Sequence, residues 1–192
     1  MIYSERSFGR IRFMRMTADR GEVGNPPAGS TLRQWRQRIQ QDLKHRLLLR
    51  AGVDKALRYD NSGKPFLSHG PYVSITHFGY TAALVLAPFP VGLDGEIPGE
   101  RLLRIRHKFL HEAELGPSQV HNPGALALIW TAKEAVYKLL GKPGLSFVRD
   151  IRVLDALPSG TGIARVDGVG EIRLQWFGSD AVFCLAHFID GK

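Results

Sequence analysis

Two carboxylates stand close together in the stretch VGLDGE, residues 91–96. Asp94 and Glu96 are separated by one glycine in a run of small and apolar residues, which we interpret as a short strand. Alternate residues of a strand point to the same side, so the two side chains would stand about 6.6 Å apart along it. Like charges that close repel each other unless a cation lies between them. The pair is therefore either two solvated acids at an exposed strand end or two ligands of a metal ion such as Mg²⁺.

A second group of residues with ionisable side chains lies in WTAKEAVYKLLGK, residues 130–142. The stretch belongs to a predicted helix that has Asn122 as its cap and Pro123 in its first turn, and that stops at Gly141. Glu134 and Lys138 are four residues apart, so the helix would present a carboxylate and an ammonium group on one face. An ordinary surface ion pair is one alternative. A capping box formed by Thr131 and Glu134 is another, although Asn122 offers a better start.

A third group lies in GKPFLSHGPYVSITHFG, residues 63–79. Lys64 is in a predicted turn, and Thr76 and His77 end a predicted strand. A lysine, a hydroxyl group and an imidazole on loop edges can bind phosphate or ribose, but a histidine at a strand end can equally be structural. We expect no histidine metal site, because the spacing of the histidines is not that of metal ligands.

Composition limits the class of protein. The chain has 192 residues, 44% of them hydrophobic, which is enough for one domain or two small halves. Cys184 is the one cysteine, so no disulfide can form within the chain, and we expect a cytoplasmic protein. No apolar run reaches the roughly 18 residues of a membrane span. Most of the net charge of +8 lies in the first 50 residues, which favours a polyanionic partner or a well-solvated basic surface.

The hydrophobic pattern predicts an α+β fold in which each half carries a helix and several strands. In the first half we expect a half-exposed strand at 8–16 and an amphipathic helix capped by Ser30 or Thr31. Its apolar positions would be Leu32, Trp35, Ile39, Leu43 and Leu47. The central and C-terminal elements are expected to be antiparallel strands at 72–77, 81–87 and 90–96, a helix over 100–115, a helix over 122–141, and strands at 150–157, 171–178 and 181–188.

The order of the motifs is more specific than any one of them. GKP (63–65), SITH (74–77), GLDGE (92–96), FLHEAE (109–114) and WTAKEAVYKLLGK (130–142) follow one another as in the 4′-phosphopantetheinyl transferase superfamily. From about residue 55 to 150 the chain resembles this family. Its length and its central acidic motifs are similar to the larger, pseudo-dimeric, surfactin-synthetase-activating type. The small trimeric type has its first aspartate near the N-terminus.

The resemblance implies a fold and a reaction. The fold would consist of two similar α/β halves related by a pseudo-two-fold axis, with antiparallel sheets and packed helices. Residues 1–90 would form the coenzyme A side and residues 91–192 the metal side of one compact monomer. The reaction would be Mg²⁺-dependent, with Mn²⁺ as an alternative ion. It would move the phosphopantetheine arm of coenzyme A to a serine of an acyl- or peptidyl-carrier protein and release 3′,5′-ADP, with no nucleic acid or membrane as partner.

The resemblance also implies roles for matching residues. Asp94, Glu96 and Glu134 would hold the metal ion. Glu134 would accept the serine proton, Lys138 would contact the phosphates and assist the leaving group, and Lys133 would have a lesser role. The coenzyme A-binding residues would be Lys64, Thr76, His77, Asp94 and Lys138. Gly95 departs from the family pattern, because an apolar branched residue is usual between the two acids, and it indicates either a weaker strand or a bulge.

Two other functions are compatible with parts of the sequence. A degenerate family member could bind coenzyme A or a carrier domain without transfer, and Gly95 favours this alternative. A nucleic-acid-binding protein could use the arginine-rich helix at 32–50, but the ordered motifs would then have no explanation.

Overall fold

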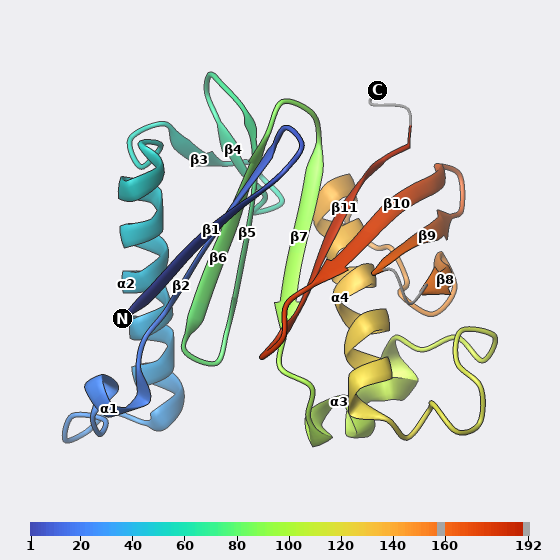
Figure 1. The fold of residues 1–192 in the computed structure, drawn as a ribbon, viewed down its shortest axis with the longest axis horizontal. Helices are drawn as coiled ribbons and strands as arrows, with labels where there is room; N and C mark the ends of the chain where they lie inside the picture. Colours follow the sequence, from blue (N-terminus) through green and yellow to red (C-terminus); the bar gives the residue numbers. More distant parts are fainter. Residues whose placement is uncertain (157–159, 190–192) are drawn as a thin grey trace. The chain divides into compact units, whose positions relative to one another are not determined.

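The chain divides into two compact units, Met1–Pro88 and Phe89–Lys192, in a computed structural model that describes residues 1–156 and 160–189. Figure 1 shows both units.

The first unit contains a four-stranded antiparallel sheet in the order β1-β2-β6-β5. The strands are β1 (Ile2–Phe8), β2 (Ile11–Thr17), β5 (Tyr72–Phe78) and β6 (Thr81–Ala87). A two-stranded ribbon is formed by β3 (Leu57–Tyr59) and β4 (Pro65–Leu67), and the helices are α1 (Arg20–Val23) and α2 (Leu32–Ala51). As expected, β5 and β6 are antiparallel neighbours.

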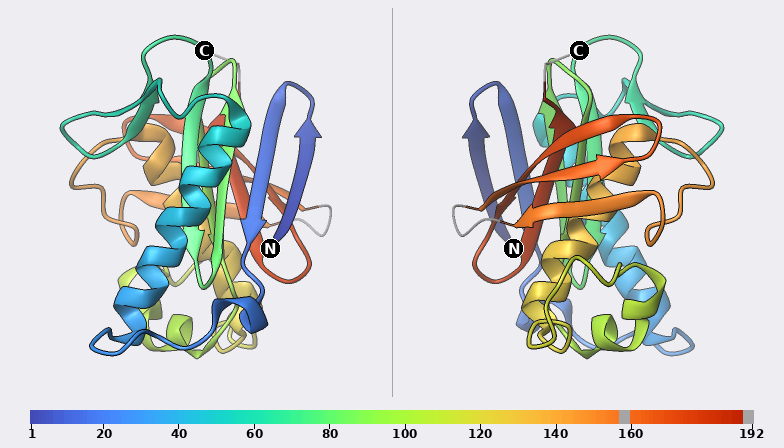
Figure 2. Two further views of the ribbon diagram at one scale, coloured as in Figure 1. Left: turned by 90° about the vertical axis from the view of Figure 1, so that its left-hand side faces the viewer. Right: turned by 90° about the vertical axis from the view of Figure 1, so that its right-hand side faces the viewer.

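Helix α2 lies along one face of this sheet (Figure 2). Of the two predicted caps, Ser30 and Thr31, the helix uses Thr31, which forms a capping box with Gln34. Leu43 and Leu47 are buried against strand residues such as Met14 and Leu84. The prediction that Leu32 lies on the apolar face of the helix was wrong. Leu32 is 53% exposed, and the helix contributes residues to the core cluster only from Ile39 onward.

The predicted single strand over residues 8–16 was also wrong. The chain turns at Gly9 and Arg10, so this stretch contains the end of β1, a tight turn and most of β2. Gly9 has a φ of 59°, a left-handed conformation that glycine adopts without the steric penalty of a Cβ atom. The basic and apolar alternation therefore belongs to β2, whose residues Ile11, Phe13 and Met14 are buried.

The second unit contains a five-stranded antiparallel sheet in the order β7-β11-β10-β9-β8. The strands are β7 (Val91–Glu96), β8 (Ile151–Ala156), β9 (Thr161–Val166), β10 (Gly170–Phe177) and β11 (Val182–Phe188). The helices are α3 (Glu100–Ile105), the 3-10 turn η1 (Arg106–Lys108) and α4 (Pro123–Leu140). Strand β9 was not predicted, and Leu157, the last residue of the strand predicted before it, lies outside the described residues.

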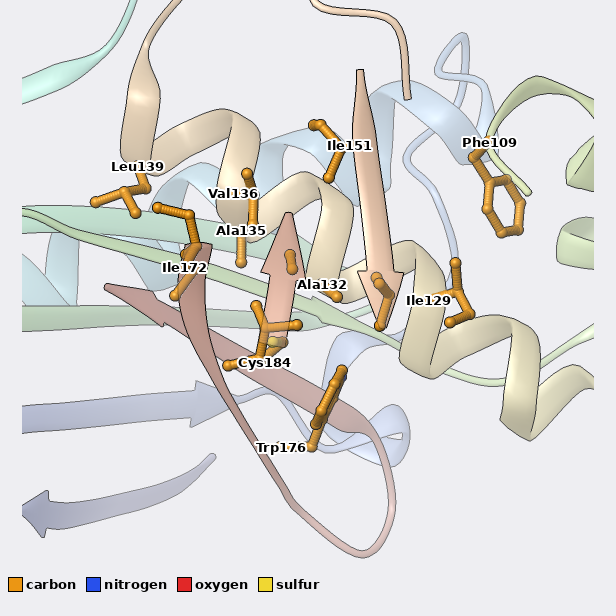
Figure 3. Close-up of a cluster of buried hydrophobic side chains, with 14 of the residues drawn as sticks. Phe109, Ile129, Ala132, Ala135, Val136, Leu139, Ile151, Ile172, Trp176 and Cys184 are labelled. Carbon is orange, nitrogen blue, oxygen red and sulfur yellow. The ribbon is translucent and has the colours of Figure 1, made fainter. Parts of the chain in front are cut away.

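Helix α4 packs across the sheet of the second unit and supplies much of its core. Asn122 caps it and Gly141 ends it in a left-handed conformation, as predicted. Figure 3 shows α4 residues such as Ala132 and Val136 beside strand residues such as Ile172 and Trp176. This packing fixes the helix that carries Glu134 and Lys138 against the sheet that carries Asp94.

Two predictions in the second unit were wrong. Strand β7 follows β6 after three residues, yet it pairs with β11 and not with β6, because the chain passes from one sheet to the other between them. The helix expected over 100–115 ends at Ile105 and is followed by η1. Beyond η1 the carbonyl oxygen of Phe109 accepts a hydrogen bond from the side chain of Lys133, so a side chain takes the place of a helical partner.

The fold class is therefore α+β with antiparallel sheets and packed helices, as predicted. Among the described residues, no helix is long and apolar enough to cross a membrane. The pseudo-two-fold relation between the halves remains a prediction.

Candidate active site

The site begins with a close contact between β7 and α4. A Cβ atom added to Gly92 would lie 1.9 Å from the carbonyl oxygen of Ala135 and 2.8 Å from the amide nitrogen of Leu139, so only glycine permits this approach. Strand and helix run in opposite directions along the contact (Figure 1). Because alternate strand residues share a face, Asp94 and Glu96 follow Gly92 on the side that faces α4.

Asp94 meets Lys138 at this contact. The Lys138 Nζ atom lies 2.6 Å from Asp94 Oδ1 and also donates to the carbonyl oxygen of Leu93 at 3.1 Å. Asp94 is 6% exposed, whereas Lys138 is half-buried. The packing of β7 on α4 therefore brings Asp94 and Lys138 into direct contact.

Glu134 lies one helical turn before Lys138 and is half-buried. Burial raises the pKa of its carboxyl group to about 7, and the negative charge of Asp94 adds to this, while Lys138 and Arg101 oppose it. Among the described residues, none donates a hydrogen bond to the Glu134 carboxylate. A carboxyl group with a pKa near neutrality can accept and release a proton at physiological pH.

Glu96 is held by a different cation. The guanidinium group of Arg101, at the start of α3, forms an ion pair with Glu96 and lies 5.3 Å from the ring centroid of Trp130. The Glu96 charge also contributes to the raised pKa of Glu134, so all three carboxylates interact electrostatically. No role was predicted for Arg101, and its position in the first turn of the helix that follows β7 was the one signal that could have suggested it.

The three carboxylates have the chemistry of a Mg²⁺ site but do not form one as their side chains stand. In the described ranges, no group of three His, Cys, Asp or Glu side chains is arranged to hold a metal ion. Lys138 and Arg101 instead neutralise Asp94 and Glu96. The set of ligands nevertheless fits a hard cation. No described residue donates a hydrogen bond to the Glu134 carboxylate, and a bound cation would offset the burial and the Asp94 charge that raise its pKa. Asp94, Glu96 and Glu134 remain predicted metal ligands.

Gly95 does not disturb β7. The pairing of β7 with β11 is continuous through Gly95, which lies opposite Phe183, so the glycine marks no bulge. The two acids on either side of it therefore keep their common face.

The predicted coenzyme A residues Lys64, Thr76 and His77 all lie in the first unit, whereas the acids and Lys138 lie in the second. Lys64 follows a turn in which Asp60 Oδ1 accepts hydrogen bonds from the amides of Ser62 and Lys64, at 2.8 and 2.9 Å. Burial lowers the pKa of the Lys64 ammonium group, and Asp60 opposes that effect. Thr76 is buried and His77 is exposed, because consecutive strand residues point to opposite faces. A ligand on one face of β5 therefore meets only one of these two side chains directly.

Comparison with known proteins identifies the family to which the chain belongs. A model of the 4′-phosphopantetheinyl transferase superfamily matches residues 90–186. The chain belongs to this superfamily. A curated relative, 4′-phosphopantetheinyl transferase gsp of Aneurinibacillus migulanus, is 29% identical over 89 residues, which cover 44% of this chain and 38% of the relative. The chain thus aligns with well under half of the length of that curated relative.

The range matched by the superfamily begins just before β7 and runs into β11. It contains Asp94, Glu96, Glu134 and Lys138. It does not contain Lys64, Thr76 or His77, so the superfamily match bears on the acidic half of the predicted site alone.

Proposed function

We propose that the protein transfers the 4′-phosphopantetheine arm of coenzyme A to a serine of an acyl- or peptidyl-carrier protein and releases 3′,5′-ADP. The observation that carries this proposal is Glu134. It is a carboxyl group with a pKa of about 7, on which the charges of Asp94 and Lys138 act, and it lies in the segment that matches the superfamily.

In the proposed reaction, the serine hydroxyl group first loses its proton. Glu134 accepts the proton of the serine hydroxyl, which makes the serine oxygen a competent nucleophile at neutral pH. That oxygen forms a bond to the phosphorus atom that carries the pantetheine arm, while the bond from this phosphorus to the bridging pyrophosphate oxygen breaks. The departing 3′,5′-ADP takes the electron pair of that bond.

Cationic groups stabilise the departing 3′,5′-ADP. We propose that Lys138 turns from Asp94 to the pyrophosphate, where its ammonium group stabilises the negative charge that develops on the leaving oxygen. Asp94, Glu96 and Glu134 would hold Mg²⁺ or Mn²⁺. A bound divalent ion neutralises phosphate charge and aligns the leaving group. Lys64, Thr76 and His77 are proposed to bind the nucleotide end of coenzyme A.

A mass measurement tests the proposal. Purified protein, coenzyme A and Mg²⁺ are incubated with an apo acyl-carrier protein and, separately, with an apo peptidyl-carrier domain, and each carrier is then weighed. We expect a gain of one phosphopantetheine group on at least one carrier and no gain with Glu134→Gln or with a chelator. A wild-type protein that modifies neither carrier would contradict the proposal.

Binding without transfer is the second candidate. It is favoured by the ion pairs that Asp94 and Glu96 make with Lys138 and Arg101 in place of a metal site. Coenzyme A binding measured by calorimetry, with no mass gain on either carrier, would select this alternative.

A further inference from the structure

Lys133, the residue before Glu134, forms a fully buried ion pair. Its Nζ atom lies 2.7 Å from Glu114 Oε1, and neither side chain has any exposed surface. The other ion pairs described for this chain all keep some exposure. A buried pair is tolerated when hydrogen bonds satisfy both of its charges, so the surroundings of Lys133 and Glu114 decide what the pair does.

Backbone groups also satisfy both charges. Lys133 Nζ donates to the carbonyl oxygens of Phe109 and Phe147, each at 2.7 Å. Glu114 accepts from the amides of Val153 and His111, each at 2.8 Å. The pair thus joins α4 to the segment after η1, to the loop that contains Phe147, and to β8.

Trp130 contacts the same two phenylalanines. Its ring lies 5.1 Å from that of Phe109 and 5.9 Å from that of Phe147, measured between centroids. Residues three apart share a helix face, so Trp130 holds the two rings while Lys133 binds the two carbonyl oxygens. We call Trp130, Lys133, Glu114, Phe109 and Phe147 the α4 clamp.

The α4 clamp and the Gly92 contact together determine how α4 is rotated. Successive helix residues are about 100° apart, so Lys133 and Glu134 point in different directions. Gly92 packs on the backbone of α4 near Ala135. Apolar packing alone tolerates small rotations, but a rotation that displaces Lys133 would leave a buried charge without its partner.

We propose that the α4 clamp positions Glu134 and Lys138 against Asp94, which makes Lys133 and Glu114 positioning residues for the reaction. Neither residue would touch coenzyme A or the carrier protein. The catalytic consequence rests on the proposed function, whereas the hold on α4 does not depend on it.

The test separates positioning from stability. Lys133→Met alone leaves Glu114 buried without its cation, so this variant should unfold at much lower denaturant concentration. The double variant Lys133→Met/Glu114→Gln removes both charges and should recover most of the stability.

We nevertheless expect the double variant to bind Mg²⁺ about tenfold more weakly by calorimetry, as when a residue that orients a metal ligand is lost. Amide hydrogen exchange should be faster at 109–114 and in α4, and kcat should fall with KM for coenzyme A unchanged.

Glu171→Gln is the matched control, because it breaks the exposed pair with Arg165 in the same unit and should leave every readout unchanged. A double variant with recovered stability and wild-type Mg²⁺ affinity, exchange and kcat would overturn the proposal. If the double variant does not fold, Glu114→Asp keeps both charges but shortens the reach, and wild-type Mg²⁺ affinity in that variant would also overturn it. Faster exchange in a protein whose wild type transfers nothing would support the clamp and contradict the proposed function.

Discussion

At the scale of single residues, Glu134 shows how surroundings change the chemistry of an ordinary side chain. Its pKa rises because burial disfavours the ionised form and because Asp94 lies near, and Lys138 and Arg101 only partly offset both causes. The folded state therefore binds a proton more tightly than the unfolded state, whose glutamate has a pKa near 4.5. Such a group stabilises the fold fully below pH 4.5, and that contribution is lost as pH rises through about 7.

Glu134→Gln tests this pH dependence in metal-free buffer. Below pH 4.5 the variant and the wild type should have similar free energies of unfolding. Above pH 7 the variant should be more stable by about 1 to 3 kcal/mol, because the wild type must bury an ionised carboxylate. Denaturant titrations from pH 4 to 8 measure the difference, with Glu112→Gln, at an exposed position of the same unit, as the control. Parallel curves for wild type and Glu134→Gln would show that burial does not act on this group.

At the scale of elements, the site depends on how closely β7 approaches α4. Gly92 allows the strand backbone to touch the helix backbone, and the strand then carries Asp94 to Lys138. Asp94 and Lys138 are 44 residues apart in the sequence. Their distance is therefore a property of the packing and not of either motif.

Gly92→Ala should separate the two elements. The added Cβ would meet backbone atoms of Ala135 that have no rotamer to relieve the clash, so we expect a loss of about 2 to 4 kcal/mol in the free energy of unfolding. Transfer activity should fall below one tenth of the wild-type value even where the variant stays folded. Gly116→Ala is the control, since its Cβ would come no closer than 3.8 Å to a flexible side chain. Equal stability of the two variants would contradict the close approach.

At the scale of the whole molecule, the net positive charge is concentrated in the first unit. Residues 1–50 carry eleven Lys and Arg and four Asp and Glu, out of a net charge of +8 for the chain. On α2, Arg33 and Arg38 are exposed. A positive field of this kind accelerates encounters with acidic proteins and polyanionic ligands, and salt screens it.

Salt should therefore weaken the encounter with an acidic carrier protein. We expect the apparent KM for the carrier to rise about tenfold between low and high ionic strength, with a smaller change in kcat. Arg33→Gln/Arg38→Gln removes two positive charges and should flatten this dependence. Steady-state transfer rates across a salt series measure both effects, and a KM that is flat in the wild type would exclude steering by charge.

Local signals predicted much of the fold. Asn122, Pro123 and Gly141 bounded α4, one of the two candidate caps of α2 was right, and the hydrophobic pattern located β5, β6, β10 and β11. Two of the errors arose where distant contacts override local preference. Phe109 and Lys133 meet where a longer helix was expected, and β7 pairs with a strand from the far end of the chain.

The sequence by itself determined which reactive side chains are available. They are three acids and a lysine, in an order that belongs to one superfamily, and they lie on helices and strands whose ends local signals predict. It determined this because caps, periodicity and motif spacing depend on residues near one another in the chain. Only the tertiary structure decided that Lys138 pairs with Asp94, that Arg101 holds Glu96, and that Lys133 is buried on Glu114. Ion pairs of this kind depend on burial and on the approach of distant backbones, which no local pattern encodes.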